Sequence, residues 1–256
     1  MRLLIIFLFV SNICHAQFMA NGWKFRGAPS GSNGLAAINT FYAKMDDSGT
    51  PIVDSKNANN GTLVSGEGAA TFSATGKLNT AISVGSGGTS WDFGDASVNR
   101  FTTQGSISLW VNPGSVSGGP LLLCKGNFNT DRNGYMLGLS GSQLFFELAN
   151  ASAVNQLTVT GTLAVSTWYH VVITWDGSII KSYVNGSFVN SISQTVNATS
   201  TGIDLTMFAG FNGTTYNSFH LQGTLDEVGL FNAALSATQV TTLYNGGTPF
   251  AFASFN

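Results

Sequence analysis

The chain has 256 residues, of which only 9% are charged, and its formal net charge at pH 7 is −2. Because it lacks a run of Lys or Arg that could meet nucleic-acid phosphates, its composition argues against nucleic-acid binding. It is rich in Gly, Ser, Thr and Asn, which indicates that hydroxyl and amide groups supply the polar surface, as is common in extracellular β proteins.

Residues 1–16 have the pattern of a secretory signal peptide. Arg2 supplies a positive charge, residues 3–10 form an apolar stretch, and residues 14–16 approximate a small-residue cleavage site. The stretch is shorter than the about 20 residues that span a bilayer, so we expect no membrane span. We predict a secreted chain, extracellular or at a cell surface. A lipid-modified Cys14 and a start at Met19 are the alternatives.

Residues 17–37 are rich in Gly, Ser and Asn and have no periodicity, which predicts an arm or linker. Short β-branched and aromatic stretches follow, separated by turn residues and without helices between them. We predict strands at 38–44, 61–64, 78–84, 105–111, 120–126, 134–140, 142–149, 155–161, 205–211 and 221–231. Such a succession is typical of a sandwich or jelly roll.

The stretch "WYHVVITWDGSIIKSYVNGSFV", at residues 168–189, predicts two consecutive β-hairpins. Its Asp176-Gly177 and Asn185-Gly186 dipeptides tolerate the positive φ angles of tight turns. Alternation predicts that Val171 and Ile173 face one side of the sheet and Val172 faces the other.

One helix is expected near the C-terminus, in "LSATQVTTLYNGG". Ser236 and Gln239 have the spacing of a capping box, and Gly246 predicts a left-handed end. Val240 and Leu243 lie three residues apart, so both could pack against the sandwich.

The sequence contains two cysteines, Cys14 and Cys124. Removal of the signal peptide would leave one thiol and no disulfide. Cys124 lies in the apolar stretch "PLLLCKG", which predicts a buried, inert thiol.

Four blocks of sequence, taken together, carry a family resemblance. They are "GSISLWVNP", "LLLCKGNFNTDRNGYMLGLSGSQLFFEL", "STWYHVVITWDGSIIKSYVNGSFV" and "LQGTLDEVGLFNAALSATQVTTLYNGG". Together they resemble the laminin-G-like, or concanavalin A-like, jelly roll domains. The resemblance implies an all-β antiparallel sandwich with one short helix over residues 38–247. Residues 248–256 would be a tail, either a docked strand or a loose end.

The acidic residues do not predict catalysis. A glycosidase of this fold needs two carboxylates that face each other across a groove, about 5 to 10 Å apart. The glutamates are Glu67, Glu147 and Glu227, and none lies in an acidic cluster of that kind. Glu147 has the alternation to reach an open sheet face, so it is a candidate ligand-binding residue, or simply one polar residue on a solvated face. We predict that the chain is not an enzyme.

Domains similar to this one often hold a structural calcium ion. A calcium ion needs six to eight oxygen ligands, and the candidates here are Asp46, Asp47 and Asp226. Pairing of the first and last strands would bring "KMDD" near "LDEV". Alternatively, Asp226 accepts hydrogen bonds from a turn and the other acids are solvated.

Exposed aromatic rings would offer stacking platforms for sugars. Trp91, Tyr135 and Tyr216 lie outside the clearly alternating strands and are candidates, although each could instead be a core residue.

Two functions remain after these exclusions. The first is a secreted, non-catalytic module that binds glycans or another surface polymer. The second is a structural or adhesive protein of a surface or particle, whose jelly roll packs against copies of itself or a protein partner. The resemblance names the fold and leaves this choice open.

Overall fold

The computed structural model describes residues 32–64, 69–127, 132–159, 162–200, 202–210 and 219–256. The chain divides into two units, Met1–Asn33 and Gly34–Asn256, and the second contains every element described below. The predicted signal peptide and the predicted arm up to residue 31 lie outside the described residues.

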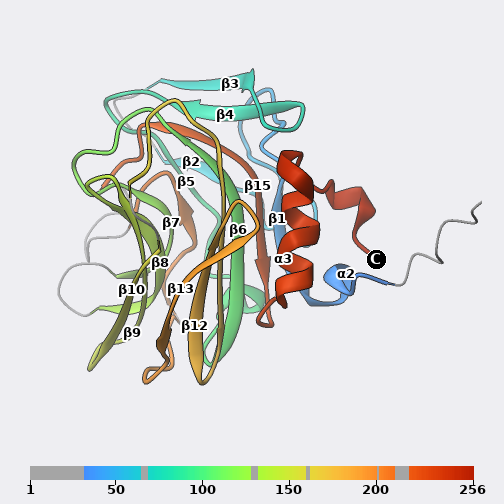
Figure 1. Cartoon of the computed structure of the whole chain (residues 1–256). Coiled ribbons are helices and arrows are strands. Elements are labelled where there is room, and N and C mark those ends of the chain that lie inside the picture. The colour runs from blue at the N-terminus through green and yellow to red at the C-terminus, as the bar shows by residue number, and fades with distance from the viewer. Residues whose placement is uncertain (1–31, 65–68, 128–131, 160–161, 201, 211–218) are drawn as a thin grey trace, which may run out of the picture. The chain divides into compact units, whose positions relative to one another are not determined.

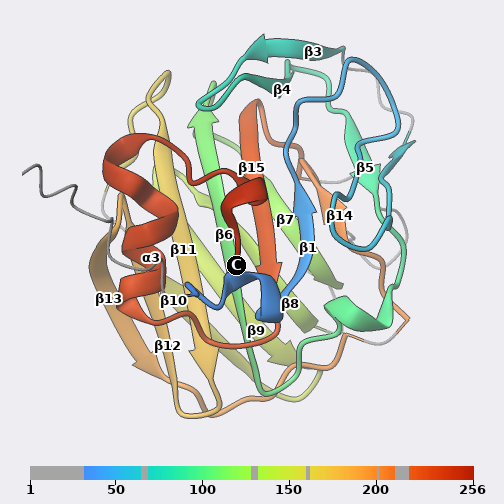
Figure 2. The same ribbon diagram turned by 90° about the vertical axis from the view of Figure 1, so that its right-hand side faces the viewer.

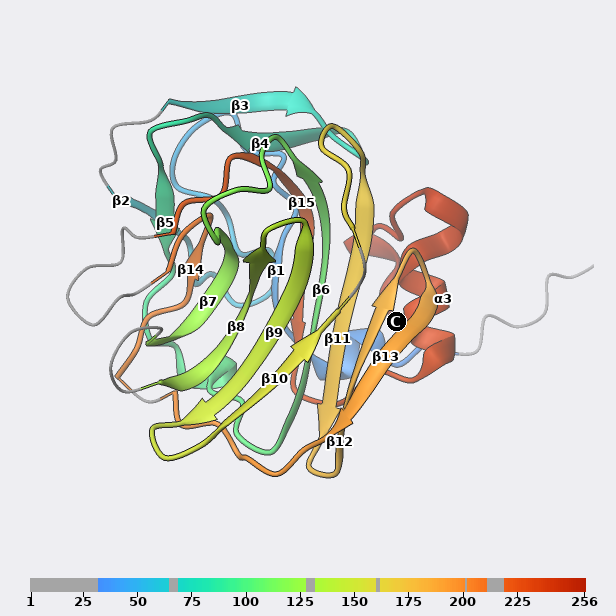
Figure 3. The ribbon, with the colours of Figure 1, turned by 60° about the vertical axis from the view of Figure 1, so that its left-hand side comes forward.

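The strands of the described residues form two antiparallel sheets that pack face to face (Figures 1 and 3). The sheet of eight strands has the order β13-β12-β11-β6-β15-β4-β3, with β1 also paired to β15. Its members are β1 (Asn39–Ala43), β3 (Ala70–Thr75), β4 (Thr80–Val84), β6 (Gln104–Pro113), β11 (Tyr169–Asp176), β12 (Ile179–Val184), β13 (Ser187–Ser193) and β15 (Gly223–Phe231).

The sheet of seven strands has the order β10-β9-β8-β7-β14-β5-β2 among the described residues. Its members are β2 (Thr62–Val64), β5 (Ser90–Asp92), β7 (Leu121–Asn127), β8 (Asn133–Ser140), β9 (Gln143–Asn150), β10 (Val154–Thr158) and β14 (Thr206–Met207). The predicted all-β sandwich is therefore confirmed.

The main core lies between the sheets and follows the predicted alternation. On β11, Val171, Ile173 and Trp175 face this core, whereas Val172 belongs to a second cluster on the opposite face of the sheet. The predicted hairpin turns are present, because Gly177 has φ +89° and Asn185 and Gly186 have φ +50° and +76°. These strands therefore pair as their local sequence predicts.

The second cluster lies under α3 (Ala237–Tyr244), on the outer face of the eight-stranded sheet (Figure 2). Val240 and Leu243 are buried there, together with Leu35 of α2 (Leu35–Ile38). The predicted capping box is formed by Ser236 and Gln239. The helix end differs from the prediction.

The first left-handed residue after α3 is Asn245, with φ +45°, and Gly246 follows it with φ +65°. Asn tolerates this conformation almost as well as Gly, so the helix ends one residue earlier than predicted.

The C-terminal tail is neither a strand nor a loose end. It forms a short 3-10 turn (Phe252–Ser254), and Phe250 and Phe255 pack against the cluster under α3. The ring of Phe252 stacks on Tyr42, with centroids 4.8 Å apart. The Phe250 amide also donates to the Leu243 carbonyl at 3.2 Å, so the tail docks through both its rings and its backbone.

The outer face of the seven-stranded sheet carries a third, smaller apolar cluster of Leu121, Cys124, Met136 and Phe145. Cys124 is buried there, as its apolar surroundings predict, and its Sγ donates to the Gly126 carbonyl at 3.1 Å. Among the described residues, no helix has the length and hydropathy needed to cross a membrane.

Candidate functional site

Glu147 lies in the middle of β9, on the outer face of the seven-stranded sheet. Its neighbours Phe146 and Leu148 point into the main core, so alternation turns Glu147 away from that core. Its Cα partners are Met136 on β8 and Gln156 on β10. The side chain is nevertheless only 1% exposed, which places a carboxylate at the bottom of this face.

The two oxygens of the Glu147 carboxylate have different surroundings. Arg132 Nη1 donates to Oε1 at 3.3 Å, and Gln156 Nε2 donates to the same oxygen at 2.7 Å. Oε2 is buried, and none of the described residues donates a hydrogen bond to it. An unsatisfied buried oxygen costs about 1–3 kcal/mol. Oε2 therefore has an unused acceptor position.

Burial raises the pKa of Glu147 above its ordinary value, while the Arg132 guanidinium and the Gln156 amide act in the opposite direction. The carboxylate is held in place by these two side chains.

A pocket of about 220 Å³ opens above this carboxylate. It is lined by Gly119, Arg132, Leu139, Ser140, Gly141, Phe145, Glu147, Gln156 and Phe219. We call it the Glu147 pocket. Phenyl rings beside a carboxylate, a guanidinium and an amide offer both an apolar wall and hydrogen-bonding groups.

Glu147 is the only carboxylate among the described residues that line this pocket. Hydrolysis of a glycosidic bond by the usual routes requires a second acid that faces the first one. The arrangement can bind and orient a ligand, but the described residues do not provide an acid pair.

Sequence reasoning missed Arg132 and Gln156. Gln156 meets Glu147 because β9 and β10 form a hairpin, and Arg132 precedes β8, the other neighbour of β9. The close succession of these strands was a usable signal. The register of the strands, which decides which side chains lie opposite each other, could not be predicted from the sequence.

Two of the predicted stacking platforms lie in the core. Trp91 and Tyr135 are both 0% exposed, so the expectation that their rings are exposed is wrong. Trp91 packs on Phe208, with centroids 5.4 Å apart, and the Tyr135 hydroxyl donates to the Asn99 carbonyl at 2.8 Å. The two residues occupy inward positions of β5 and β8. Tyr216 lies outside the described residues.

The predicted pairing of the first and last strands is correct, since β1 pairs with β15. The Asp226 Oδ2 atom accepts hydrogen bonds from the Lys77 and Leu78 amides, at 2.7 and 2.9 Å. Of the two roles predicted for Asp226, the structure shows the one in which it accepts hydrogen bonds from a turn. Asp46 accepts from the Thr80 amide at 3.1 Å, and Asp47 from the Val53 amide at 3.3 Å.

Burial raises the pKa of Asp226 to about 8 and that of its neighbour Glu227 to about 7. The hydroxyl of Tyr42 donates to Glu227. Among the described residues, no group of three or more His, Cys, Asp or Glu side chains is placed to hold a metal ion. As arranged, these carboxyls do not fit the oxygen-rich shell that calcium needs.

The two packed antiparallel sheets, with a ligand-sized pocket on an outer sheet face, define a β-sandwich domain of the jelly-roll class. The family model described as the concanavalin A-like lectin/glucanases superfamily matches residues 85–241, more than half of the chain. The chain belongs to this superfamily. No curated protein matches it.

Solved structures show the same fold. The binding domain of Paraclostridial Mosquitocidal Protein 1 is similar with a TM-score of 0.65 and 17% identity, over 82% of this chain and 52% of that one. Domain 4 of AbnA, an extracellular arabinanase from Geobacillus stearothermophilus in complex with arabinotriose, has a TM-score of 0.63 and 18% identity, over 81% and 98%.

A structure of botulinum neurotoxin type C, whose cell entry depends on two ganglioside molecules, has a TM-score of 0.62 and 16% identity. The match covers 84% of this chain and 52% of that one, so this chain spans about half the length of the two toxin structures. Identities this low show the fold alone.

Proposed function

We propose that this chain is a secreted, non-catalytic glycan-binding module that holds one sugar residue in the Glu147 pocket. The observation that carries the proposal is the carboxylate itself. Glu147 Oε1 is fixed by Arg132 and Gln156, while the buried Oε2 receives no donor from the described residues. A sugar hydroxyl that donates to Oε2 would satisfy this oxygen.

The shape of the pocket supports a single ring as the ligand. Its volume of about 220 Å³ is below the about 300–1,000 Å³ of pockets for drug-sized ligands. The Phe145 and Phe219 rings provide an apolar wall against which the C–H face of a sugar can pack, while the polar groups meet its hydroxyls.

Two of the structural neighbours support the ligand class. One is bound to arabinotriose and another is described by its interaction with gangliosides, both of which present sugar residues.

Saturation-transfer difference NMR with single sugars tests the proposal. We would screen glucose, galactose, mannose, N-acetylglucosamine, arabinose and sialic acid against the parent and Glu147→Gln. The amide in the variant presents N–H groups where the ligand hydroxyl needs an acceptor. We expect the signal of the bound sugar to fall by about tenfold or more.

Asp176→Asn is the matched control. It also converts a carboxylate to an amide, but on the β11–β12 turn, where an Asn oxygen can still accept from the Ser178 and Ile179 amides. Equal binding by the parent and Glu147→Gln, or no binding of any sugar by the folded parent, would contradict the proposal.

A second candidate function, adhesion between copies of the chain, is favoured by one strand. β13 lies at the end of its sheet, and its Phe188 and Val189 are 57% and 39% exposed. Edge strands with exposed apolar residues are templates for pairing with another strand. Sedimentation velocity of the parent and of Phe188→Lys tests this role: a dimer that the variant loses would favour it, and a monomeric parent would exclude it.

A further inference from the structure

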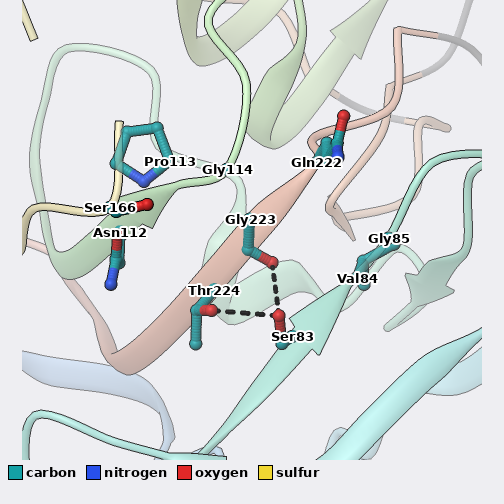
Figure 4. Close-up of a pocket in the computed structure, with 10 residues that line it drawn as sticks. All are labelled: Ser83, Val84, Gly85, Asn112, Pro113, Gly114, Ser166, Gln222, Gly223 and Thr224. Atoms are coloured by element: carbon teal, nitrogen blue, oxygen red, sulfur yellow. Dashed lines mark hydrogen bonds between the residues drawn. The ribbon is translucent and has the colours of Figure 1, made fainter. Parts of the chain in front are cut away.

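A second hollow lies at the ends of β4, β6 and β15 (Figure 4), and among the described residues it shares no lining residue with the Glu147 pocket. Its volume is about 280 Å³, and a neighbouring hollow of about 220 Å³ shares Gly85 and Gln222 with it. We call the two hollows together the rim groove.

Three polar side chains cross the rim groove in one row. Thr224 on β15 has Ser83 on β4 and Asn112 on β6 as its Cα partners. The adjacent Val84, Val111 and Leu225 face the main core, so alternation places the row on the outer face of the eight-stranded sheet. This face is opposite to the one that carries Glu147.

The hydroxyls of this row are already oriented. Thr224 Oγ1 donates to Ser83 Oγ at 3.1 Å, and Ser83 Oγ donates to the Gly223 carbonyl at 3.5 Å (Figure 4). Because both hydroxyl protons are used within the row, the free lone pairs of Thr224 Oγ1 point to a ligand that donates. Asn112 beside it can both donate and accept.

The lining of the rim groove carries no Asp, Glu, Lys or Arg side chain among the described residues. Its polar side chains are Ser and Thr hydroxyls, Asn and Gln amides and one His, and the rest of the lining is Val84, Pro113 and glycines. A charged ligand would find no opposite charge here, whereas a neutral ligand rich in hydroxyls would find matching hydrogen-bonding groups.

The register of β11 against β6 places one aromatic residue, Trp168, beside the row and outside the residues that line the two hollows. Trp168 immediately precedes Tyr169, whose Cα partner is Val111, so Trp168 lies next to Asn112. Tyr169 packs against the main core, and alternation therefore carries Trp168 to the outer face. Trp168 is only half-buried, unlike Trp91 and Trp175, which are 0% exposed.

We infer that the rim groove is a second glycan-binding site, specific for neutral, hydroxyl-rich chains, in which Trp168 stacks on a sugar ring and the Ser83–Thr224–Asn112 row binds its hydroxyls. The Ser83–Thr224–Asn112 row lies on the eight-stranded sheet, and none of the described residues lines both the rim groove and the Glu147 pocket.

Affinity electrophoresis in gels containing neutral arabinan, dextran or laminarin tests the inference, with anionic heparin as the charged comparison. The parent is expected to be retarded by at least one neutral polysaccharide and not by heparin. Thr224→Val keeps the side-chain shape and removes the acceptor, so it should weaken retardation about tenfold. Trp168→Ala should abolish retardation, and Trp168→Phe, which keeps a ring, should preserve most of it.

Two controls separate this site from the first one. Thr224→Val should weaken retardation as much in a Glu147→Gln background as in the parent, and Thr103→Val makes the same substitution at an exposed position just before β6, at the end of that strand opposite to Asn112. The inference is overturned if the folded parent is not retarded by any neutral polysaccharide. It is also overturned if Thr224→Val and Trp168→Ala are retarded as strongly as the parent, or if Glu147→Gln alone abolishes retardation.

Discussion

At the scale of single residues, His170 is a buried titratable group outside both candidate sites. Its ring lies 5.0 Å from that of Trp110 and 6.0 Å from that of Tyr244, centroid to centroid, and its Nε2 contacts Ser108 Oγ at 3.0 Å. Burial lowers the pKa of His170 to about 3. The folded chain therefore holds this imidazole neutral over the range in which an exposed imidazole takes up a proton.

We expect His170 to make the protein less stable in acid. The unfolded imidazole has a pKa of about 6.5, so between about pH 6.5 and 3 only the unfolded chain binds a proton at this residue. The free energy of unfolding then falls as the pH falls, by up to about 1.4 kcal/mol per pH unit from this group. Urea denaturation at pH 7, 6, 5 and 4 should show a flatter pH dependence for His170→Gln than for the parent. The same pH dependence of the free energy of unfolding in His170→Gln and in the parent would contradict this account.

Lys125 gives a second prediction at this scale, because its side chain is fully buried. Its Nζ donates to Asp95 Oδ1 at 2.8 Å and to the Ile203 carbonyl at 2.6 Å. Lys125→Met leaves the carbonyl unpaired, so it should lower the free energy of unfolding by about 2–3 kcal/mol. Lys181→Met, at a less buried position of β12, should change it by less than about 0.5 kcal/mol. Equal effects in denaturant titrations would show that the buried amine is not stabilising.

Single residues were also where sequence reasoning succeeded and failed. The clear alternation of "LFFEL" correctly turned Glu147 away from the main core. Trp91 lies in β5, where no strand was predicted, whereas Tyr135 lies in the predicted strand 134–140, whose inward face was not assigned from its sequence. Whether an isolated aromatic residue is buried depends on where its strand begins and on which face of the sheet it then occupies.

At the scale of elements, two tight turns form a matched pair. Gly186, between β12 and β13, has φ +76°, and an added Cβ would lie 2.7 Å from the Tyr244 ring. Gly141, between β8 and β9, has φ +60° and open space around it. The two positions share the backbone conformation and differ in what a methyl group would meet.

Gly141→Ala should therefore cost only the left-handed strain, about 1–2 kcal/mol. Gly186→Ala should cost about 1–3 kcal/mol more, because the methyl group displaces Tyr244 from its place on α3. Thermal unfolding of the two variants checks this difference. Equal losses of stability in the two variants would mean that Tyr244 moves away from the added methyl group at little cost.

The strands with clear alternation or apolar runs were predictable, and the weaker ones were not. β3, with the sequence "ATFSAT", is an edge strand with Phe72 as its one large apolar residue and with alternate residues exposed, and β5 has only three residues. Their pairing depends on the neighbouring strand β4 and on β2 and β14. Arg132 and Gln156 were missed for the same reason, since contacts across strands follow from register.

At the scale of the whole molecule, the two candidate sites lie on the outer faces of different sheets. None of the described residues lines both sites, although His220 of the rim groove follows Phe219 of the Glu147 pocket directly in the chain. A polymer or surface with many sugar residues could occupy both sites on one chain, which would raise the apparent affinity without any new contact.

Stability of the whole fold should not depend on calcium. The carboxyls of Asp46 and Asp226 already accept backbone amides, and the described residues provide no metal-binding group of three or more side chains. A site filled at a hundred times its Kd would add about 2.7 kcal/mol and a rise of several degrees in Tm. We expect equal Tm values in millimolar calcium and in chelator, and a higher Tm in calcium would contradict this arrangement.

The most direct test of the central claim is a glycan-array screen of the full chain beside its Glu147→Gln and Asp176→Asn variants, all shown to be folded. The account predicts binding of one sugar class by the parent and by Asp176→Asn, with or without a chelator, and loss of that class by Glu147→Gln. Silence of the parent across the array, or the same pattern for all three proteins, would contradict it.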